Sequence, residues 1–473
     1  MIRTTVLPLC LATAALLGGC AAPNAERPAP RETAQLPAQW SQPTPPGAAP
    51  AELRGWWKAF GDATLDGLVQ EALAHNLDVA QALSRVREAR LQSGRADVQF
   101  RPSLTASART LQDIAAEDTY FHASIDTVWE LGLFGAAEST RQVGASDAAA
   151  AQAEAQGVRV LVVADVVRHY LDLRAAQRQL QGLARLAEVD ERSAALAEVR
   201  VRTQLGPADE VAQARLRAAQ VRAAQALPRE VAARAAQSLA LLLGRAAPDP
   251  AWSAAGAAPA LAPFALAELP ADLLRTRPDI QTAEAGVYKA AAVLGLSRSE
   301  LYPRVVLMGS LLYSYNITRN LRTRVSSSPL LGPVIDIPLF DWGRRQMQVQ
   351  ASQEALNAAL LGYRRAVLQA VAEAEGALAA MAAQQTRADA LGQALAIARE
   401  RVGTTQTQAR LGLASEYQGL AQRRQQLESE SELALAQDAR ALAFVALYKA
   451  LGGAPLPAPD TTAEAEAQAG KAP

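Results

Sequence analysis

Histidine, cysteine and aromatic residues are scarce in this chain of 473 residues: it has three histidines, two cysteines and 5% aromatic residues. His75, His122 and His169 lie far apart, and none belongs to a metal-binding pair such as His-x3-His. The sequence also lacks a phosphate-binding Gly-Lys-Ser/Thr loop. We therefore expect no enzymatic activity, no catalytic residue, no cofactor and no metal site.

An excess of one charge is also missing, since 47 basic residues balance 47 acidic ones. A balanced charge argues against nucleic acid as a partner. Half of the residues are hydrophobic, yet alanine supplies much of that fraction. Alanine-rich sequence with many charges favours long packed helices over a compact core of large side chains.

The N-terminus carries the features of a secretory signal over residues 1–19, with an early Arg3 and a short apolar run. Its ending, Leu17-Gly18-Gly19-Cys20, resembles a bacterial lipobox, whose cysteine becomes the lipidated first residue of the mature chain. Because Cys10 lies within the signal, Cys20 would be an unpaired thiol in an exported protein, and acylation explains it. The alternative is an ordinary signal followed by a chance cysteine. Ala21, in the place where aspartate would favour inner-membrane retention, indicates the outer membrane.

Proline and small polar residues divide the rest of the chain. Residues 20–50 read as an extended tether, 244–269 as a linker, and 454–473 as a disordered tail. The two remaining segments, 51–243 and 270–453, are similar. Asn76-Leu77-Asp78-Val79 matches Arg277-Pro278-Asp279-Ile280, and Leu205-Gly206 matches Leu411-Gly412. Such landmarks keep their order at offsets of 201 to 208 residues, which indicates an internal duplication.

Each half predicts a helix, a strand pair, a long helix, a glycine turn and a second long helix. The strands are expected at about 103–112, 120–130, 304–315 and 328–338, where polar and apolar residues alternate. The polar face of the first pair consists of Ser103, Thr105, Ser107, His122, Ser124 and Asp126, and the apolar face includes Leu104, Ala106, Phe121 and Ile125. A proline-free stretch from Ala136 to Leu205 predicts a helix roughly 100 Å long at 1.5 Å per residue.

Strands of this length cross an outer membrane when tilted, but a chain with four of them cannot close a barrel. Small closed barrels begin at about eight strands. The chain must therefore pool its strands with copies of itself. The predicted fold is an α+β membrane protein in which a ring of strands continues into a ring of long helices, and such a ring encloses a conduit.

At this point a family resemblance becomes specific. The segments Trp56-Trp57-Lys58-Ala59-Phe60, Leu269–Ile280 and Phe340-Asp341-Trp342-Gly343 resemble those of the TolC-like outer-membrane factors, in their lipoprotein (OprM/NodT-like) branch. The resemblance covers about residues 20–453. It implies a homotrimer with a twelve-strand outer-membrane barrel on a periplasmic helical barrel. It also implies a periplasmic adaptor and an inner-membrane RND or ABC pump as partners.

The two helical turns form the expected periplasmic mouth, which the resemblance implies to be the adaptor-docking site. The turns consist of Leu205, Gly206 and Pro207, and of Leu411, Gly412 and Leu413. Each glycine is expected to supply the positive φ with which helices commonly end, and Pro207 suits the first turn of the next helix. Relatives place an acidic residue after the second turn, where this chain has Tyr417-Gln418-Gly419-Leu420. Asp209, Glu210 and Glu416 are the nearest gate candidates, with solvated helix-start charges as the alternative.

Drug or toxic-compound efflux is the expected employment of the duct. Type I secretion of a protein toxin is the alternative, and a structural coiled-coil lipoprotein is a third interpretation, which the strand pairs disfavour.

Acylation of Cys20 has a direct test. Cys20→Ser should abolish incorporation of a fatty-acid probe, because the thiol is the acceptor atom. Persistent label on that variant would contradict the lipobox. Export should survive the substitution if the barrel itself holds the protein in the membrane.

Overall fold

The computed structural model describes residues 40–41, 55–113, 118–254, 256, 259–262, 277–318 and 327–453. The expected signal 1–19, Cys20, most of the tether and the tail 454–473 lie outside these residues. Contacts divide the chain into two units. The described part of unit 1 lies within residues 84–153 and 279–366, and that of unit 2 within residues 40–83, 154–278 and 367–453. Helices α4, α5 and α9 contribute residues to both units.

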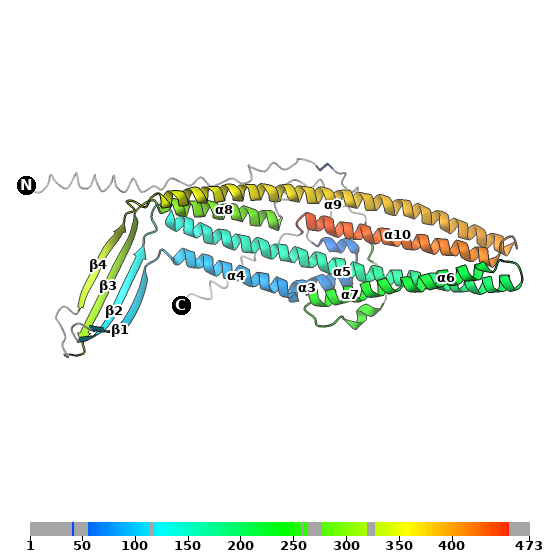
Figure 1. The fold of residues 1–473 in the computed structure, drawn as a ribbon, viewed down its shortest axis with the longest axis horizontal. Helices are drawn as coiled ribbons and strands as arrows, with labels where there is room; N and C mark the ends of the chain where they lie inside the picture. Colours follow the sequence, from blue (N-terminus) through cyan, green and yellow to red (C-terminus); the bar gives the residue numbers. More distant parts are fainter. Residues whose placement is uncertain are drawn as a thin grey trace, which may run out of the picture. The chain divides into compact units, whose positions relative to one another are not determined.

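Unit 1 contains a four-stranded antiparallel sheet in the order β1-β2-β3-β4 (Figure 1). The strands are β1 (Ser103–Asp113), β2 (Asp118–Glu130), β3 (Arg304–Asn316) and β4 (Ser327–Asp336). Ser103 faces Val128, Tyr120 faces Asn316, and Arg304 faces Asp336. One edge of β1 and one edge of β4 have no partner strand among the described residues.

The helices of unit 1 follow the order of the strands. They are the end of α4 (Leu77–Val98), the start of α5 (Ala136–Arg202), α8 (Pro278–Ser299) and the start of α9 (Arg344–Arg410). Gly144 of α5 approaches Ser93 of α4 so closely that an added Cβ would lie 3.0 Å from its Cα. Lys289 of α8 pairs with Asp147 of α5 at 2.7 Å. Ser297 and Ser352 join α8 to α9 through a hydroxyl–hydroxyl hydrogen bond of 2.9 Å.

Two equivalent turns connect strands to long helices. Phe134 and Gly135 have φ values of 56° and 85°, and Trp342 and Gly343 have 58° and 79°. An aromatic residue in the left-handed region is uncommon. Its recurrence at an offset of 208 residues shows that both turns use one backbone conformation. Asp341 caps α9 by accepting hydrogen bonds from the Gly343 and Arg345 amides.

Unit 2 contains α3 (Ala63–His75), most of α5, α6 (Asp209–Ala224), α7 (Ala226–Leu242), most of α9, and α10 (Glu416–Ala450). Two short 3-10 helices, η1 (Trp56–Phe60) and η2 (Pro250–Ser253), complete it. Trp56 of η1 stacks on Tyr448 of α10 with ring centroids 5.2 Å apart. Phe60 meets Phe444 edge to face at 5.5 Å. These contacts hold the start of the described chain against its last helix.

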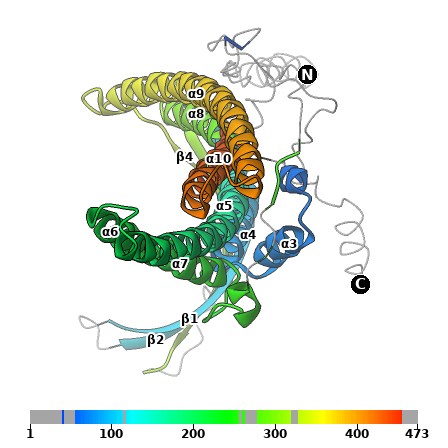
Figure 2. The same ribbon diagram turned by 90° about the vertical axis from the view of Figure 1, so that its right-hand side faces the viewer.

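Ion pairs join α5 to α10 along their length (Figure 2). Arg178 pairs with Asp438, Arg424 with Asp190 at 2.9 Å, and Arg192 with Glu416 at 2.7 Å. The side chain of Asp190 is completely buried, whereas both members of the Arg192–Glu416 pair are more than half exposed. The first of these two pairs should therefore matter far more to stability.

The two halves repeat one contact in detail. The Asn76 side chain caps α4 by accepting from the Asp78 and Val79 amides, and it donates to the Leu242 carbonyl at 2.9 Å. Arg277, the equivalent residue 201 positions later, donates to the Ala450 carbonyl. Each repeat thus fastens the end of its last helix to the residue that precedes its second-strand-pair helix. We call this contact the repeat clasp.

The repeats differ in two places. Pro228 divides the last helix of the first repeat into α6 and α7, because proline cannot donate to the carbonyl one turn earlier. Its equivalent, Ala436, lies inside the continuous α10. The equivalent positions are 201 residues apart through β1 and β3 and 208 apart from β2 and β4 onward. The difference is one step of seven residues, located in the β3–β4 connection.

The expected linker is partly ordered. Residues 250–253 form η2, Trp252 is buried, and Gln177 of α5 donates to the Trp252 carbonyl at 2.6 Å. Arg245 pairs with Glu71 of α3 at 2.7 Å. The first part of the linker therefore packs against the helices of unit 2.

The buried pair gives a stability prediction. Arg424→Met leaves the Asp190 carboxylate buried without its partner and should cost about 3 kcal/mol of unfolding free energy. Arg192→Met, the matched control at an exposed pair, should cost at most about 1 kcal/mol. Denaturant unfolding followed by circular dichroism measures both. Equal losses for the two variants would contradict the distinction.

Candidate functional site

The strand register places all six expected polar residues on one face of the sheet. Directly opposed residues of an antiparallel pair share a face. Ser103, Thr105 and Ser107 of β1 face Val128, Asp126 and Ser124 of β2, and His122 shares that face two residues further along β2. We call this surface the polar face.

A hydrogen-bond network centred on Asp126 crosses three strands of the polar face. The Ser124 hydroxyl donates to Asp126 Oδ2 at 2.7 Å, and the Ser310 hydroxyl of β3 donates to Oδ1 at 2.6 Å. The hydroxyls of Ser107 and Ser124 lie 2.9 Å apart. The carboxylate is therefore held in place by side chains from β2 and β3.

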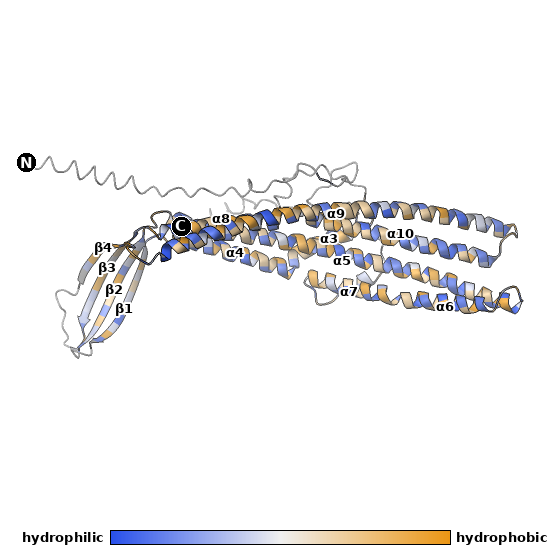
Figure 3. Ribbon diagram, turned by 45° about the horizontal axis from the view of Figure 1, so that its top comes forward, coloured by the Kyte–Doolittle hydropathy of each residue, from blue (hydrophilic) through white to orange (hydrophobic). Residues whose placement is uncertain are grey.

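The polar face extends beyond the residues singled out from the sequence. Arg109 faces His122, and Ser310 faces Asp126. Alternation in β1 and β3 could have identified both. Met308, Leu312, Leu330 and Val334 also belong to this face, so the second repeat makes it less polar than the first. Colouring by hydropathy shows the mixed character of the strands (Figure 3).

The other face of the sheet is apolar. Leu104, Ala106, Phe121 and Ile125 lie on it as expected from the alternation, together with Leu307, Leu311, Tyr313, Leu331 and Ile335. Leu104 and Leu331 are 75% and 79% exposed in the single chain. An apolar sheet surface of this extent requires a partner or a lipid environment.

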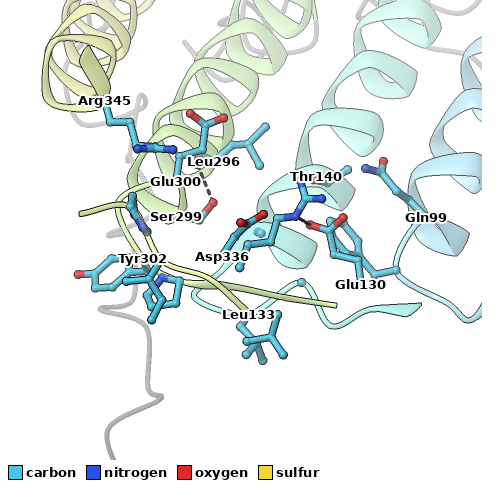
Figure 4. Close-up of a pocket in the computed structure, with 18 of the residues that line it drawn as sticks. Gln99, Glu130, Leu133, Thr140, Leu296, Ser299, Glu300, Tyr302, Asp336 and Arg345 are labelled. Carbon is cyan, nitrogen blue, oxygen red and sulfur yellow. Dashed lines mark hydrogen bonds and ion pairs between the residues drawn. The ribbon is translucent and has the colours of Figure 1, made fainter. Parts of the chain in front are cut away.

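A cavity of about 710 Å³ lies where the strands of unit 1 turn into helices (Figure 4). Its lining includes Gln99, Glu130, Asp336 and Arg345. Arg304 approaches Glu130 to 3.7 Å, and Arg345 pairs with Asp341 at 3.1 Å. Among the residues that the structure describes, no group of three or more His, Cys, Asp or Glu side chains is placed to hold a metal ion.

The turn between α9 and α10 ends the helix as expected. Gly412 has φ +75°. The Leu413 amide donates to the Gln408 carbonyl at 2.8 Å, and the Gly412 amide donates to the Ala409 carbonyl at 3.0 Å. This pair of bonds is a Schellman motif, in which the left-handed residue strongly favours glycine. Ser415 and Gln418 then form a capping box that starts α10.

The turn between α5 and α6 corrects one expectation. Gly206 is not among the glycines with positive φ, and Gln204 occupies the left-handed position instead, at φ 54°. The Leu205 amide donates to the Arg200 carbonyl at 2.7 Å, so Gln204 is the counterpart of Gly412. The sequence comparison was wrong by two residues because it aligned the glycines. Leu205 and Leu413 are the true equivalents, and both are highly exposed. Pro207 precedes α6 by two residues and accepts a hydrogen bond from the Glu210 amide.

The acidic gate candidates take part in contacts within one chain. Glu210 pairs with Arg200 at 3.0 Å, and this hydrogen bond raises the pKa of the guanidinium above its ordinary value. The Arg200 guanidinium lies 5.1 Å from the ring centroid of Tyr417. Glu416 pairs with Arg192, and Asp209 accepts from Gln213. The two helical turns of unit 2 are thus connected through α5.

A family model described as outer membrane efflux protein matches residues 68–245 and 269–453. The pyoverdine export outer membrane protein OpmQ of Pseudomonas aeruginosa is 28% identical, with 93% of this chain and 94% of OpmQ covered. The cation efflux system protein CusC of Escherichia coli is 26% identical, with 95% and 99% covered. The solved structure of the outer-membrane channel OprN superposes with a TM-score of 0.78 at 28% identity, covering 90% of this chain and 97% of OprN.

The two turns predict opposite effects of substitution. Gly412→Val places a β-branched residue at φ +75° and should loosen the end of α9, although space for the side chain is open. Gln204→Gly should relieve a non-glycine residue of the left-handed conformation and tighten the end of α5. Hydrogen exchange of the turn amides should rise in the first variant and fall in the second. A fall in both would contradict the Schellman assignment.

Proposed function

Because this chain belongs to the outer membrane efflux protein family, we propose that three copies assemble into one duct that spans the outer membrane and extends into the periplasm. The chain is an outer-membrane efflux channel and not an enzyme. The observation that carries the proposal is a four-stranded sheet with one polar face, one apolar face and two open edges.

The open edges require further strands. In lipid, every exposed backbone N–H or C=O group costs several kcal/mol, so a spanning sheet must close on itself. Four strands are fewer than the smallest closed barrels contain. Three copies supply twelve strands, and β4 of one copy then meets β1 of the next. The apolar face meets lipid, and the polar face, with Ser103, Thr105, Ser107, His122, Ser124 and Asp126, lines the water-filled lumen.

The long helices also carry surface that a single chain leaves uncovered. Leu361, Leu368 and Ile397 of α9 are each more than half exposed. An 18-residue window of α9 has a mean hydropathy of 1.3 and is 28% buried. By composition alone this window could cross a membrane. In the proposed trimer, the apolar surface of α9 packs against neighbouring helices of the periplasmic barrel.

The helical turns are the proposed mouth for partners. Leu205 and Leu413 occupy equivalent positions after the left-handed residue and present apolar side chains for a periplasmic adaptor. Gly206, Pro207, Leu411 and Gly412 shape these turns. An inner-membrane pump of the RND or ABC class delivers the cargo to the mouth. Glu210 and Glu416, through Arg200 and Arg192, keep the two turns of each chain together in the closed duct, and Asp209 lies at the same end.

Small molecules are the proposed cargo. The names of two relatives specify pyoverdine export and cation efflux, and neither specifies a secreted protein. Type I secretion of a protein toxin uses the same duct geometry and remains the alternative. The cargo is chosen by the pump, since the duct conducts whatever reaches its mouth.

The two faces of the sheet give a direct test of the barrel. Ile125→Arg puts a charge on the lipid face and should cost about 2–4 kcal/mol near the bilayer midplane, so assembled protein in the outer membrane should fall. Ser124→Arg, one residue away on the polar face, should be tolerated. Outer-membrane fractions probed by immunoblotting measure both variants. Equal assembly of the two would contradict the proposed orientation.

Export itself has its own test. Deleting the gene should raise the cellular accumulation of a fluorescent efflux substrate, and the wild-type chain should restore its exit. Gly412→Val should restore it poorly at normal assembly, because the docking turn is distorted. Normal export by that variant would remove the turn from the docking site, and unchanged accumulation in the deletion strain would favour protein secretion.

A further inference from the structure

The two repeats predict how neighbouring copies meet, given the proposed trimer. Inside one chain, the second strand of repeat one pairs with the first strand of repeat two, β2 with β3. In a closed ring, the second strand of repeat two, β4, meets the first strand of repeat one, β1, in the next copy. The seam between copies is therefore the equivalent of a seam that the structure describes.

The register of the unseen seam follows from the known one. Positions of β3 correspond to β1 with an offset of 201 residues, and positions of β4 correspond to β2 with an offset of 208. Val128 of β2 faces Met308 of β3. Its equivalent in β4 is Asp336, and the equivalent of Met308 in β1 is Ser107. The register therefore sets Asp336 opposite Ser107 of the next copy, and both residues lie on the polar face.

The aromatic turns give a second, independent correspondence. Phe134 stacks on Tyr302 with ring centroids 4.9 Å apart and planes inclined by 15°. The equivalents of these residues are Trp342 and Arg101. Trp342 is 86% exposed in the single chain, and Arg101 is exposed as well. A guanidinium stacks on an indole face as readily as a phenol ring does.

The helices supply a third correspondence. Gly295 of α8 lies so close to α5 that an added Cβ would sit 2.5 Å from Ser139 Oγ. The equivalent of Gly295 is Gly94 of α4, again a glycine, and nothing in its own chain lies within 4 Å of a Cβ placed there. The equivalent of Ser139 is Met347 of α9, which is 60% exposed. A glycine kept at a position that is open in the single chain fits a close approach by the neighbouring copy.

We infer that β4 of one copy pairs antiparallel with β1 of the next with Asp336 opposite Ser107, that Trp342 stacks on Arg101 of that copy, and that Met347 packs over its Gly94. The partner is a second copy of this chain. The seam extends from the sheet through the strand–helix turn into the first helical turns.

Disulfide cross-linking in intact outer membranes tests the register. The double variant Asp336→Cys/Ser107→Cys should form covalent dimers and trimers on a non-reducing gel after mild oxidation. Val128→Cys/Met308→Cys is the matched control, because it has the equivalent geometry within one chain and should close an intramolecular bridge. Asp336→Cys with Thr105→Cys or with Arg109→Cys, shifted by two residues along β1, should cross-link at least tenfold less.

The outcomes separate the register from the trimer. A shifted pair that cross-links more than Asp336–Ser107 overturns the register while the duct stands. Closure of the control bridge, with no cross-linked species from any of the three inter-copy pairs and a monomer on a native gel, overturns both. For the stacking contact, Trp342→Ala and Arg101→Ala should each lower the temperature at which the trimer dissociates, and the double variant should lose no more than the worse single one. Additive losses would overturn the stack.

Discussion

The need to satisfy backbone hydrogen bonds in lipid governs the rest of this molecule. Four strands leave two edges whose N–H and C=O groups have no partner strand in the described chain, and hydrocarbon offers none. A chain with so few strands spans a membrane only by sharing them with copies of itself. The duplication, the equal strand lengths and the paired strand–helix turns all follow from a ring built of six similar units.

The helices obey a related constraint. At 67 residues each, α5 and α9 are too long to be stabilised by one compact core, and their exposed apolar residues need neighbours. Within one chain, ion pairs from α5 to α10 and the two repeat clasps supply part of this packing. Between chains, the same faces must be covered by copies. A tube is the arrangement that satisfies strands and helices together, and transport follows from its open centre.

Alternation along the strands made them and their polar face predictable, because side chains of a strand change faces with every residue. The strand bounds in the structure differ from the predicted ones by only a few residues. The left-handed residue of the first turn was missed, because the sequence shows Gly206 while the hydrogen bonds select Gln204. The break at Pro228 and the seven-residue step in the β3–β4 connection became visible only once equivalent residues were fixed by contacts. The network from Ser107 to Ser310 likewise joins segments that are distant in sequence.

The central claim is that one chain cannot form the membrane pore and that copies must complete it. The mass of the complex extracted from outer membranes in mild detergent, determined by light scattering with the detergent contribution subtracted, tests it most directly. The account predicts three copies in each particle. A folded particle that contains a single copy would contradict it.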